Sequence, residues 1–167
     1  MKLLTVTVPC FNSQDYMEKC IESLLRGGER VEIIVINDGS KDRTGEIGDR
    51  YAAQYPGMVK VVHQENGGHG AGINAGLKAA TGKYFKQLDG DDWFETENLP
   101  AFLDLLSRVD ADYVVTPMRM VNESDGSEVV RDYFENLQEG TYPFDEMDFQ
   151  SISPMHCSCF RTKLLQE

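Results

Sequence analysis

The chain has little positive charge and no long apolar run. Its 167 residues carry 16 Lys and Arg against 28 Asp and Glu, for a net charge of −12. This excess of carboxylates would repel DNA or RNA, so we expect no nucleic-acid partner. No apolar stretch approaches the roughly 18 residues that a membrane-spanning helix needs, and no signal peptide is visible. We therefore expect a cytoplasmic protein.

The chain also lacks a CxxC pair, although it has four cysteines. Cys10 and Cys20 lie in apolar patterns and are expected to be small buried residues. The segment His156-Cys157-Ser158-Cys159 contains metal-ligating residue types. However, neighbouring strand positions point to opposite faces and no second ligand pair follows. We interpret the segment as a buried strand with reduced thiols, which suits the cytoplasm, and not as a zinc site.

Composition and length indicate one globular domain. Hydrophobic residues make up 41% and charged residues 26% of the chain, which is ordinary for a folded domain. Strand-like and helix-like segments alternate over the first two thirds. The strand-like ones are 3–8, 31–36, 58–62 and 84–88, and the helix-like ones are 15–25, 44–55 and 70–80. This order predicts an α/β, Rossmann-like three-layer fold around a mostly parallel sheet.

The last third of the chain is less regular. Pro100 is tolerated in the first turn of a predicted helix at 98–109. We further predict strands at 111–117, 128–134 and 157–160, a turn at 122–127, a short helix at 142–149 and a helix start at Thr162.

Polar segments follow three of the predicted strands, at 10–13, 37–40 and 89–92. Parallel sheets bind ligands beyond the carboxyl ends of their strands, so we expect these segments to converge. In the last one, Asp89-Gly90-Asp91-Asp92 gathers three carboxylates that a divalent cation would neutralise, and Mg²⁺ and Mn²⁺ prefer such oxygen ligands. The alternative is an acidic turn that caps the next helix. An EF-hand is excluded, since its ligand spacing is absent.

Two further features could contact a nucleotide. Asp38 either caps the turn that follows it or accepts an N–H from a ligand, such as N3 of a pyrimidine. Residues 66–76 are rich in glycine but do not follow the first strand, which excludes a dinucleotide fingerprint. These glycines are expected to allow close backbone approach to a ligand and to present helix N–H groups to anionic oxygens. His69 is either a donor to the ligand or a surface histidine.

Taken together, the motifs resemble the inverting family 2 glycosyltransferases with the GT-A fold. They occur in one order and are Thr5-Val-Thr-Val-Pro-Cys-Phe-Asn12, Val35-Ile-Asn-Asp-Gly-Ser-Lys-Asp42, Asn66-Gly-Gly68, Asn74-Ala-Gly-Leu77 and Leu88-Asp-Gly-Asp-Asp92. The resemblance implies a metal-dependent transfer of a sugar from a nucleoside-diphosphate sugar, with UDP favoured, to an acceptor hydroxyl. It also implies a place in cell-wall or exopolysaccharide biosynthesis.

The resemblance also assigns roles to residues of this chain. The expected nucleotide-binding residues are Pro9, Cys10, Phe11, Asn12, Asp38, Gly68, His69 and Asp89. Asp89 and Asp91 are the expected ligands of Mn²⁺ or Mg²⁺, with Asp91 the first to test, and Asp91 and Asp92 are expected at the sugar and diphosphate. Many relatives carry Ala-Arg-Asn where this chain has Gly72-Ile73-Asn74, so the diphosphate depends more on the metal or on His69.

The resemblance also implies how the chain is organised. We expect a donor-binding core at 1–121 and, at 122–167, the start of an acceptor-side region that is cut before its end. The catalytic base is expected beyond Glu167, with Glu146 and Asp148 as weaker candidates. The implied partners are the nucleotide sugar and a carbohydrate or lipid-linked acceptor, with peripheral membrane association in the full-length protein.

Two alternatives remain beside this function. The first is a nucleotide-sugar-binding fragment without turnover, because the catalytic base is absent. The second is a nucleotidyltransferase, which we disfavour because residues 9–16 contain no Lys or Arg.

Overall fold

The computed structural model describes residues 2–134, 138, 140–143 and 154–167. The elements in chain order are β1 (Leu4–Cys10), α1 (Met17–Leu25), η1 (Gly28–Arg30), β2 (Val31–Asp38), α2 (Thr44–Gln54), β3 (Val59–Gln64), α3 (His69–Ala79), β4 (Tyr84–Gln87), α4 (Leu99–Arg108), β5 (Tyr113–Val115), β6 (Met118–Val121), β7 (Glu128–Arg131), η3 (Met155–Cys157), β8 (Ser158–Arg161) and α5 (Thr162–Gln166).

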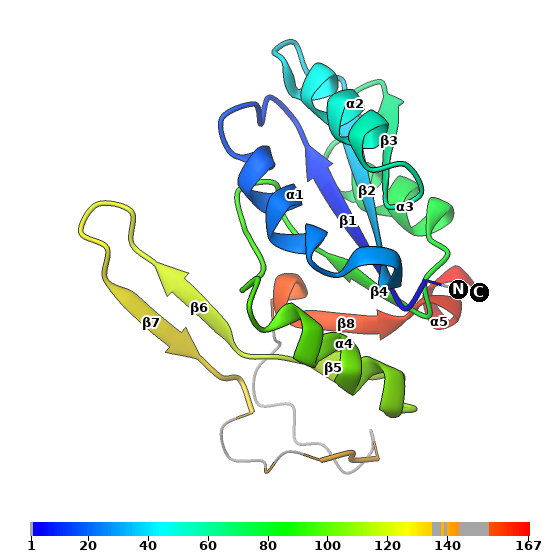
Figure 1. The fold of residues 1–167 in the computed structure, drawn as a ribbon, viewed down its shortest axis with the longest axis vertical. Helices are drawn as coiled ribbons and strands as arrows, with labels where there is room; N and C mark the ends of the chain where they lie inside the picture. Colours follow the sequence, from blue (N-terminus) through cyan, green and yellow to red (C-terminus); the bar gives the residue numbers. More distant parts are fainter. Residues whose placement is uncertain (1, 135–137, 139, 144–153) are drawn as a thin grey trace.

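Six of the strands form one sheet in the order β3-β2-β1-β4-β8-β5 (Figure 1). Strands β3, β2, β1 and β4 are parallel to one another, and β8 runs antiparallel between β4 and β5. The predicted α/β fold with a mostly parallel sheet is therefore confirmed. Because β8 pairs with β4, the sheet joins the two regions that we separated at residue 121, and that division stays a prediction.

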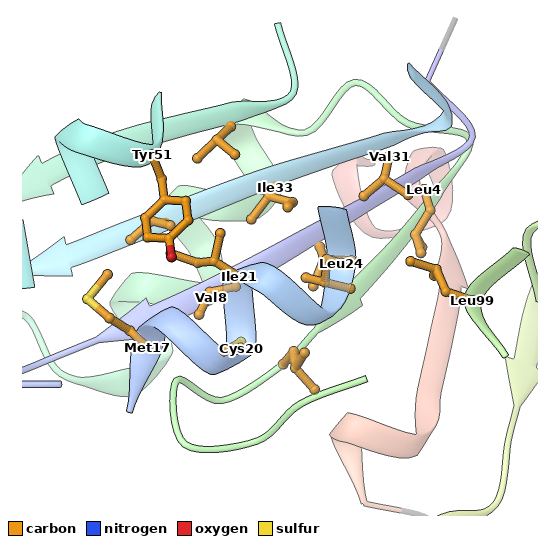
Figure 2. Packing of buried hydrophobic residues seen from close by; sticks show 14 of the residues in the cluster. Leu4, Val8, Met17, Cys20, Ile21, Leu24, Val31, Ile33, Tyr51 and Leu99 are labelled. Atoms are coloured by element: carbon orange, nitrogen blue, oxygen red, sulfur yellow. The ribbon is translucent and has the colours of Figure 1, made fainter. Parts of the chain in front are cut away.

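Alternate residues of β2 face two different layers. Val31, Ile33 and Val35 belong to the main apolar cluster, together with side chains from α1, α2 and α4. Figure 2 shows Met17, Cys20, Ile21 and Leu24 of α1 over the sheet in this cluster. Burying a side chain of this size contributes about 1.5–3 kcal/mol, so this layer supplies much of the stability. This buried layer thus fixes the positions of the carboxyl ends of the parallel strands, where the polar segments begin.

Helix α3 packs unusually close to the opposite face of the sheet. A Cβ atom at Gly76 would overlap the side chain of Thr7, and one at Gly72 would lie 3.3 Å from Cβ of Pro9. We expected the glycines of 66–76 to serve the approach of a ligand. For Gly72 and Gly76, the structure instead shows close packing of the helix on β1, because a side chain there would push α3 outward.

The main departures from the predicted elements follow residue 110. The predicted strand at 111–117 is shorter, because Pro117 has no N–H to continue a ladder, and it is followed by β6. Strand β6 pairs with β7 in a hairpin that projects away from the sheet (Figure 1). Strand β7 ends at Arg131 and not at 134. The predicted helix at 142–149 lies largely outside the described residues. None of the described helices is long and apolar enough to cross a lipid bilayer.

Candidate active site

The three polar strand-end segments meet at one edge of the sheet. The backbone N–H of Asn12 donates to Oγ of Ser40 at 3.0 Å, and Lys41 N–H donates to Oδ1 of Asn12 at 2.8 Å. Asn12 is held in the left-handed region, with φ 51°. On the other side, a Cβ at Gly90 would lie 3.2 Å from Sγ of Cys10. The segment after β1 therefore bridges those after β2 and β4, as we expected.

Asp38 closes the loop between β3 and α3. Its Oδ1 accepts Gln64 Nε2 at 2.7 Å and Gly67 N–H at 2.9 Å, and its Oδ2 accepts Gly68 N–H at 2.9 Å. Burial raises the pKa of Asp38, but these three hydrogen bonds outweigh it and hold the pKa below its ordinary value. Asp38 thus orients the entry to α3, a role that goes beyond capping its own turn.

A cavity of about 700 Å³ lies beside this loop. Its lining includes Phe11, Gly39, Lys41 and Asn66. Phe11 is 53% exposed, which is unusual for a phenylalanine in a folded domain. The cavity thus offers an exposed aromatic ring, and its lining also includes Gln64, which donates to the buried carboxylate of Asp38.

The acidic segment folds into a tight turn at the end of β4. Asp92 N–H donates to the carbonyl of Asp89 at 3.0 Å. Asp89, Asp92 and His156 each present one ligand atom, and all three atoms lie within 4.8 Å of one another. Asp91 is exposed and lies outside this group, so its assignment as the first metal ligand stays a prediction.

Burial raises the pKa of Asp92, and the neighbouring carboxylates of Asp89 and Asp91 raise it further, whereas His156 lowers it. The turn therefore concentrates negative charge that a cation would relieve.

Sequence reasoning missed His156, which we placed in an inert strand. The structure puts it in η3, just before β8, with Nδ1 3.8 Å from Oδ2 of Asp92. Lys86 holds this turn in place by donating to the carbonyls of His156 and Ser158. Burial lowers the pKa of Lys86. A lysine inside the apolar strand 84–88 was a signal that could have drawn attention to this contact.

The four cysteines are buried and free, as expected. The resemblance placed Gly68 and His69 at the nucleotide, and the structure puts Gly68 at the N-cap of α3 with φ 83°. The Nε2 atom of His69 lies 3.7 Å from Oδ1 of Asp89. The two weaker base candidates, Glu146 and Asp148, lie outside the described residues.

A second cavity, of about 810 Å³, adjoins Asp91 and Asp92 on the side of the hairpin. One part of its lining is apolar and includes Phe94, Met118 and Val121. Arg119 of β6 forms ion pairs with Glu95 at 3.3 Å and with Glu128 at 2.6 Å. The pair with Glu95 connects the hairpin to the loop that follows the acidic turn, and the pair with Glu128 joins the two strands of the hairpin.

This fold and this edge define a glycosyltransferase of the GT-A type. The chain matches the model of glycosyl transferase family 2 over residues 5–167, and it belongs to that family. It is 45% identical over 92 residues to the uncharacterized glycosyltransferase EpsJ of Bacillus subtilis, covering 54% of this chain and 26% of EpsJ. It is 31% identical over 149 residues to the glycosyltransferase GlyA of Streptococcus pneumoniae, covering 86% of this chain and 21% of GlyA.

Solved structures agree with this assignment. The chain superposes on TarS of S. aureus in complex with UDP with a TM-score of 0.79 and 27% identity, covering 99% of this chain and 48% of TarS. TarS in complex with UDP-GlcNAc gives a TM-score of 0.77 and 28% identity. The chain thus spans about a quarter of the two curated relatives and just under half of TarS.

Proposed function

We propose that the protein transfers a sugar from a nucleoside-diphosphate sugar, with UDP favoured, to an acceptor hydroxyl with inversion. The observation that carries the proposal is the meeting of three strand-end segments beside the group of Asp89, Asp92 and His156. Family membership and the complexes of TarS with UDP and UDP-GlcNAc support a nucleotide-sugar donor.

We place the nucleobase of the donor in the cavity of about 700 Å³, against the exposed ring of Phe11. An ionised carboxylate offers about four acceptor positions, and Asp38 uses three of them within the chain. The remaining position suits one N–H donor, such as N3 of uracil. Pro9, Cys10 and Asn12 belong to the segment that shapes this side of the site.

The group of Asp89, Asp92 and His156 fits a divalent cation. Two carboxylates supply the oxygen ligands that Mg²⁺ and Mn²⁺ share, and the imidazole nitrogen favours Mn²⁺ over Mg²⁺. When bound, such a cation stabilises the negative charge that develops on a departing nucleoside diphosphate. We assign the ion to these three residues and keep Asp91, which is exposed beside them, as a further ligand or a contact to the donor sugar.

We place the acceptor in the cavity of about 810 Å³. It lies next to Asp92, so an acceptor hydroxyl there would approach the sugar from the side of the hairpin. Its apolar lining offers a surface for a lipid-linked or carbohydrate acceptor. The base that removes the proton from the hydroxyl is not assigned among the described residues.

Release of UDP from a panel of UDP-sugars, with and without acceptor saccharides, tests the proposed function. We expect acceptor-dependent release with Mn²⁺ and loss of release in Asp92→Asn. Glu29→Gln should leave the release unchanged, because Glu29 is an exposed residue of η1, which lies at the N-terminal end of β2. Binding of UDP without any release would favour a nucleotide-sugar-binding fragment without turnover. Absence of UDP binding would contradict the proposal.

A further inference from the structure

Gln87, the last residue of β4, has no role in the site described so far. It is buried, with 4% of its surface exposed. Among the described residues, its Oε1 is the one buried side-chain oxygen or nitrogen without a hydrogen-bond partner. A buried acceptor without a partner destabilises the fold, so some other contact must hold the Gln87 amide in this orientation.

The contacts of the amide nitrogen fix this orientation. Nε2 of Gln87 donates to Oδ1 of Asp89 at 2.6 Å and lies 2.9 Å from Nε2 of His69. An ionised carboxylate only accepts hydrogen bonds, so an amide flipped by 180° would set two acceptors against each other. The nitrogen therefore faces Asp89, although this leaves Oε1 without a partner.

The same contacts determine where His69 carries its proton. One N–H of the Gln87 amide is directed to Asp89, and the other reaches Nε2 of His69. That ring nitrogen must accept, so the neutral imidazole is protonated at Nδ1. The side chain of His69 is 57% exposed, which leaves an N–H donor accessible at the start of α3.

We propose that Gln87 is a positioning residue for the donor diphosphate, an inference that rests on the proposed function. The Gln87 amide, held by Asp89, sets the tautomer of His69, so that Nδ1–H of His69 donates to an anionic oxygen of the diphosphate. Residues 66–76 contain no Lys or Arg, so this part of the site offers the phosphate neutral N–H donors. Helix α3 begins at His69, and the free backbone N–H groups at its N-terminus also favour an anionic oxygen.

Nitrogen-15 NMR of the histidine rings tests the first step without any ligand. The chain has three histidines, and a His69→Asn variant identifies the signals of His69. At pH 8.5, where an ordinary imidazole is neutral, we expect His69 to be protonated at Nδ1. Gln87→Glu, whose carboxylate only accepts, should shift the proton to Nε2. Nε2–H in the wild type, or an unchanged tautomer in Gln87→Glu, would overturn the inference.

Titration with UDP in the presence of Mn²⁺ tests the second step. We expect Gln87→Met and His69→Ala each to weaken UDP binding by about 10- to 100-fold, the effect of one hydrogen bond to a charged group. The double variant should bind no more weakly than His69→Ala. His69→Asn, whose amide N–H lies near the position of Nδ1–H, should recover most of the affinity, whereas His69→Gln should not.

Gln54→Met, at the exposed end of α2, is the matched control and should bind as the wild type does. Additive effects of Gln87→Met and His69→Ala would contradict a shared role. If Gln87→Met does not fold, the tautomers of the wild type and of Gln87→Glu still decide the question. Wild-type protein that binds no nucleotide would overturn the proposed function, whereas full affinity in His69→Ala would overturn this inference alone.

Discussion

Nδ1 of His156 lies 3.8 Å from Oδ2 of Asp92, although the two residues belong to segments far apart in the chain. If these side chains hold the cation, His156→Ala should weaken Mn²⁺ binding by at least about 10-fold, whereas Mg²⁺, which favours oxygen ligands, should lose less. Electron paramagnetic resonance of free Mn²⁺ measures this affinity. His63→Ala, an exposed histidine on β3, is the control, and equal losses in the two variants would remove His156 from the ligand set.

Lys86 keeps the turn around His156 on the sheet. Lys86→Met removes the donor to the part-buried carbonyl of His156 and the buried carbonyl of Ser158, and we expect a loss of about 1–3 kcal/mol in the free energy of unfolding. Mn²⁺ affinity should fall as well, because His156 is no longer held near Asp92. Urea denaturation measures the first effect. Lys78→Met, exposed on α3, should leave both quantities unchanged, and a fully stable Lys86→Met would show that the turn is held by other contacts.

Asp38 should make the stability depend on acid pH. A carboxyl whose pKa is lower in the folded than in the unfolded state stabilises the fold above its ordinary value, here 3.8, and loses this contribution as the pH falls through the folded value. Asp38→Asn, which weakens the three hydrogen bonds, should cost about 2 kcal/mol at pH 7. The difference from the wild type should shrink below pH 3. Urea denaturation at both pH values tests this, and an equal difference at pH 7 and in acid would disprove the linkage.

Gly76 should tolerate no side chain. Its Cβ would overlap Thr7, so Gly76→Ala should destabilise the fold by about 1–3 kcal/mol through displacement of α3. Gly70→Ala is the matched control in the same helix, since no atom lies within 4 Å of its added Cβ. That variant should be neutral or more stable by up to about 1 kcal/mol. Thermal unfolding compares the two, and equal melting temperatures would show that α3 is not packed as described.

The sequence was informative where one local pattern determines the structure. The run 31–36, which is apolar except for Glu32, and the helices around it predicted a buried parallel strand, and β2 is one. The rule that ligands bind beyond the carboxyl ends of strands placed Asn12, Asp38 and Asp89 at one edge. That prediction needed only the element order and no distances.

The contacts that the sequence did not predict depend on long-range packing. His156 and Asp92 meet because β8 inserts between β4 and β5, and no local pattern shows this insertion. The hairpin of β6 and β7 was equally hidden, because Pro117 divides a strand-like stretch and only pairing reveals where the chain turns. The tautomer of His69 depends on Gln87, a residue that looks like an ordinary part of a buried strand.

The central claim is that a nucleoside diphosphate binds at this edge of the sheet with a divalent cation. Calorimetric titration with UDP, dTDP and GDP, each with Mn²⁺ and in EDTA, tests it most directly. A bound ligand also stabilises the fold, by an amount that grows with the logarithm of the free ligand concentration, so thermal unfolding is a second measurement. Asp91→Ala and Asp92→Asn, measured beside Glu29→Gln, would show which carboxylate the ion needs. We expect UDP to bind most tightly, only with Mn²⁺, and weakly to the Asp92→Asn variant. Equal UDP binding in EDTA and in both aspartate variants would contradict the claim.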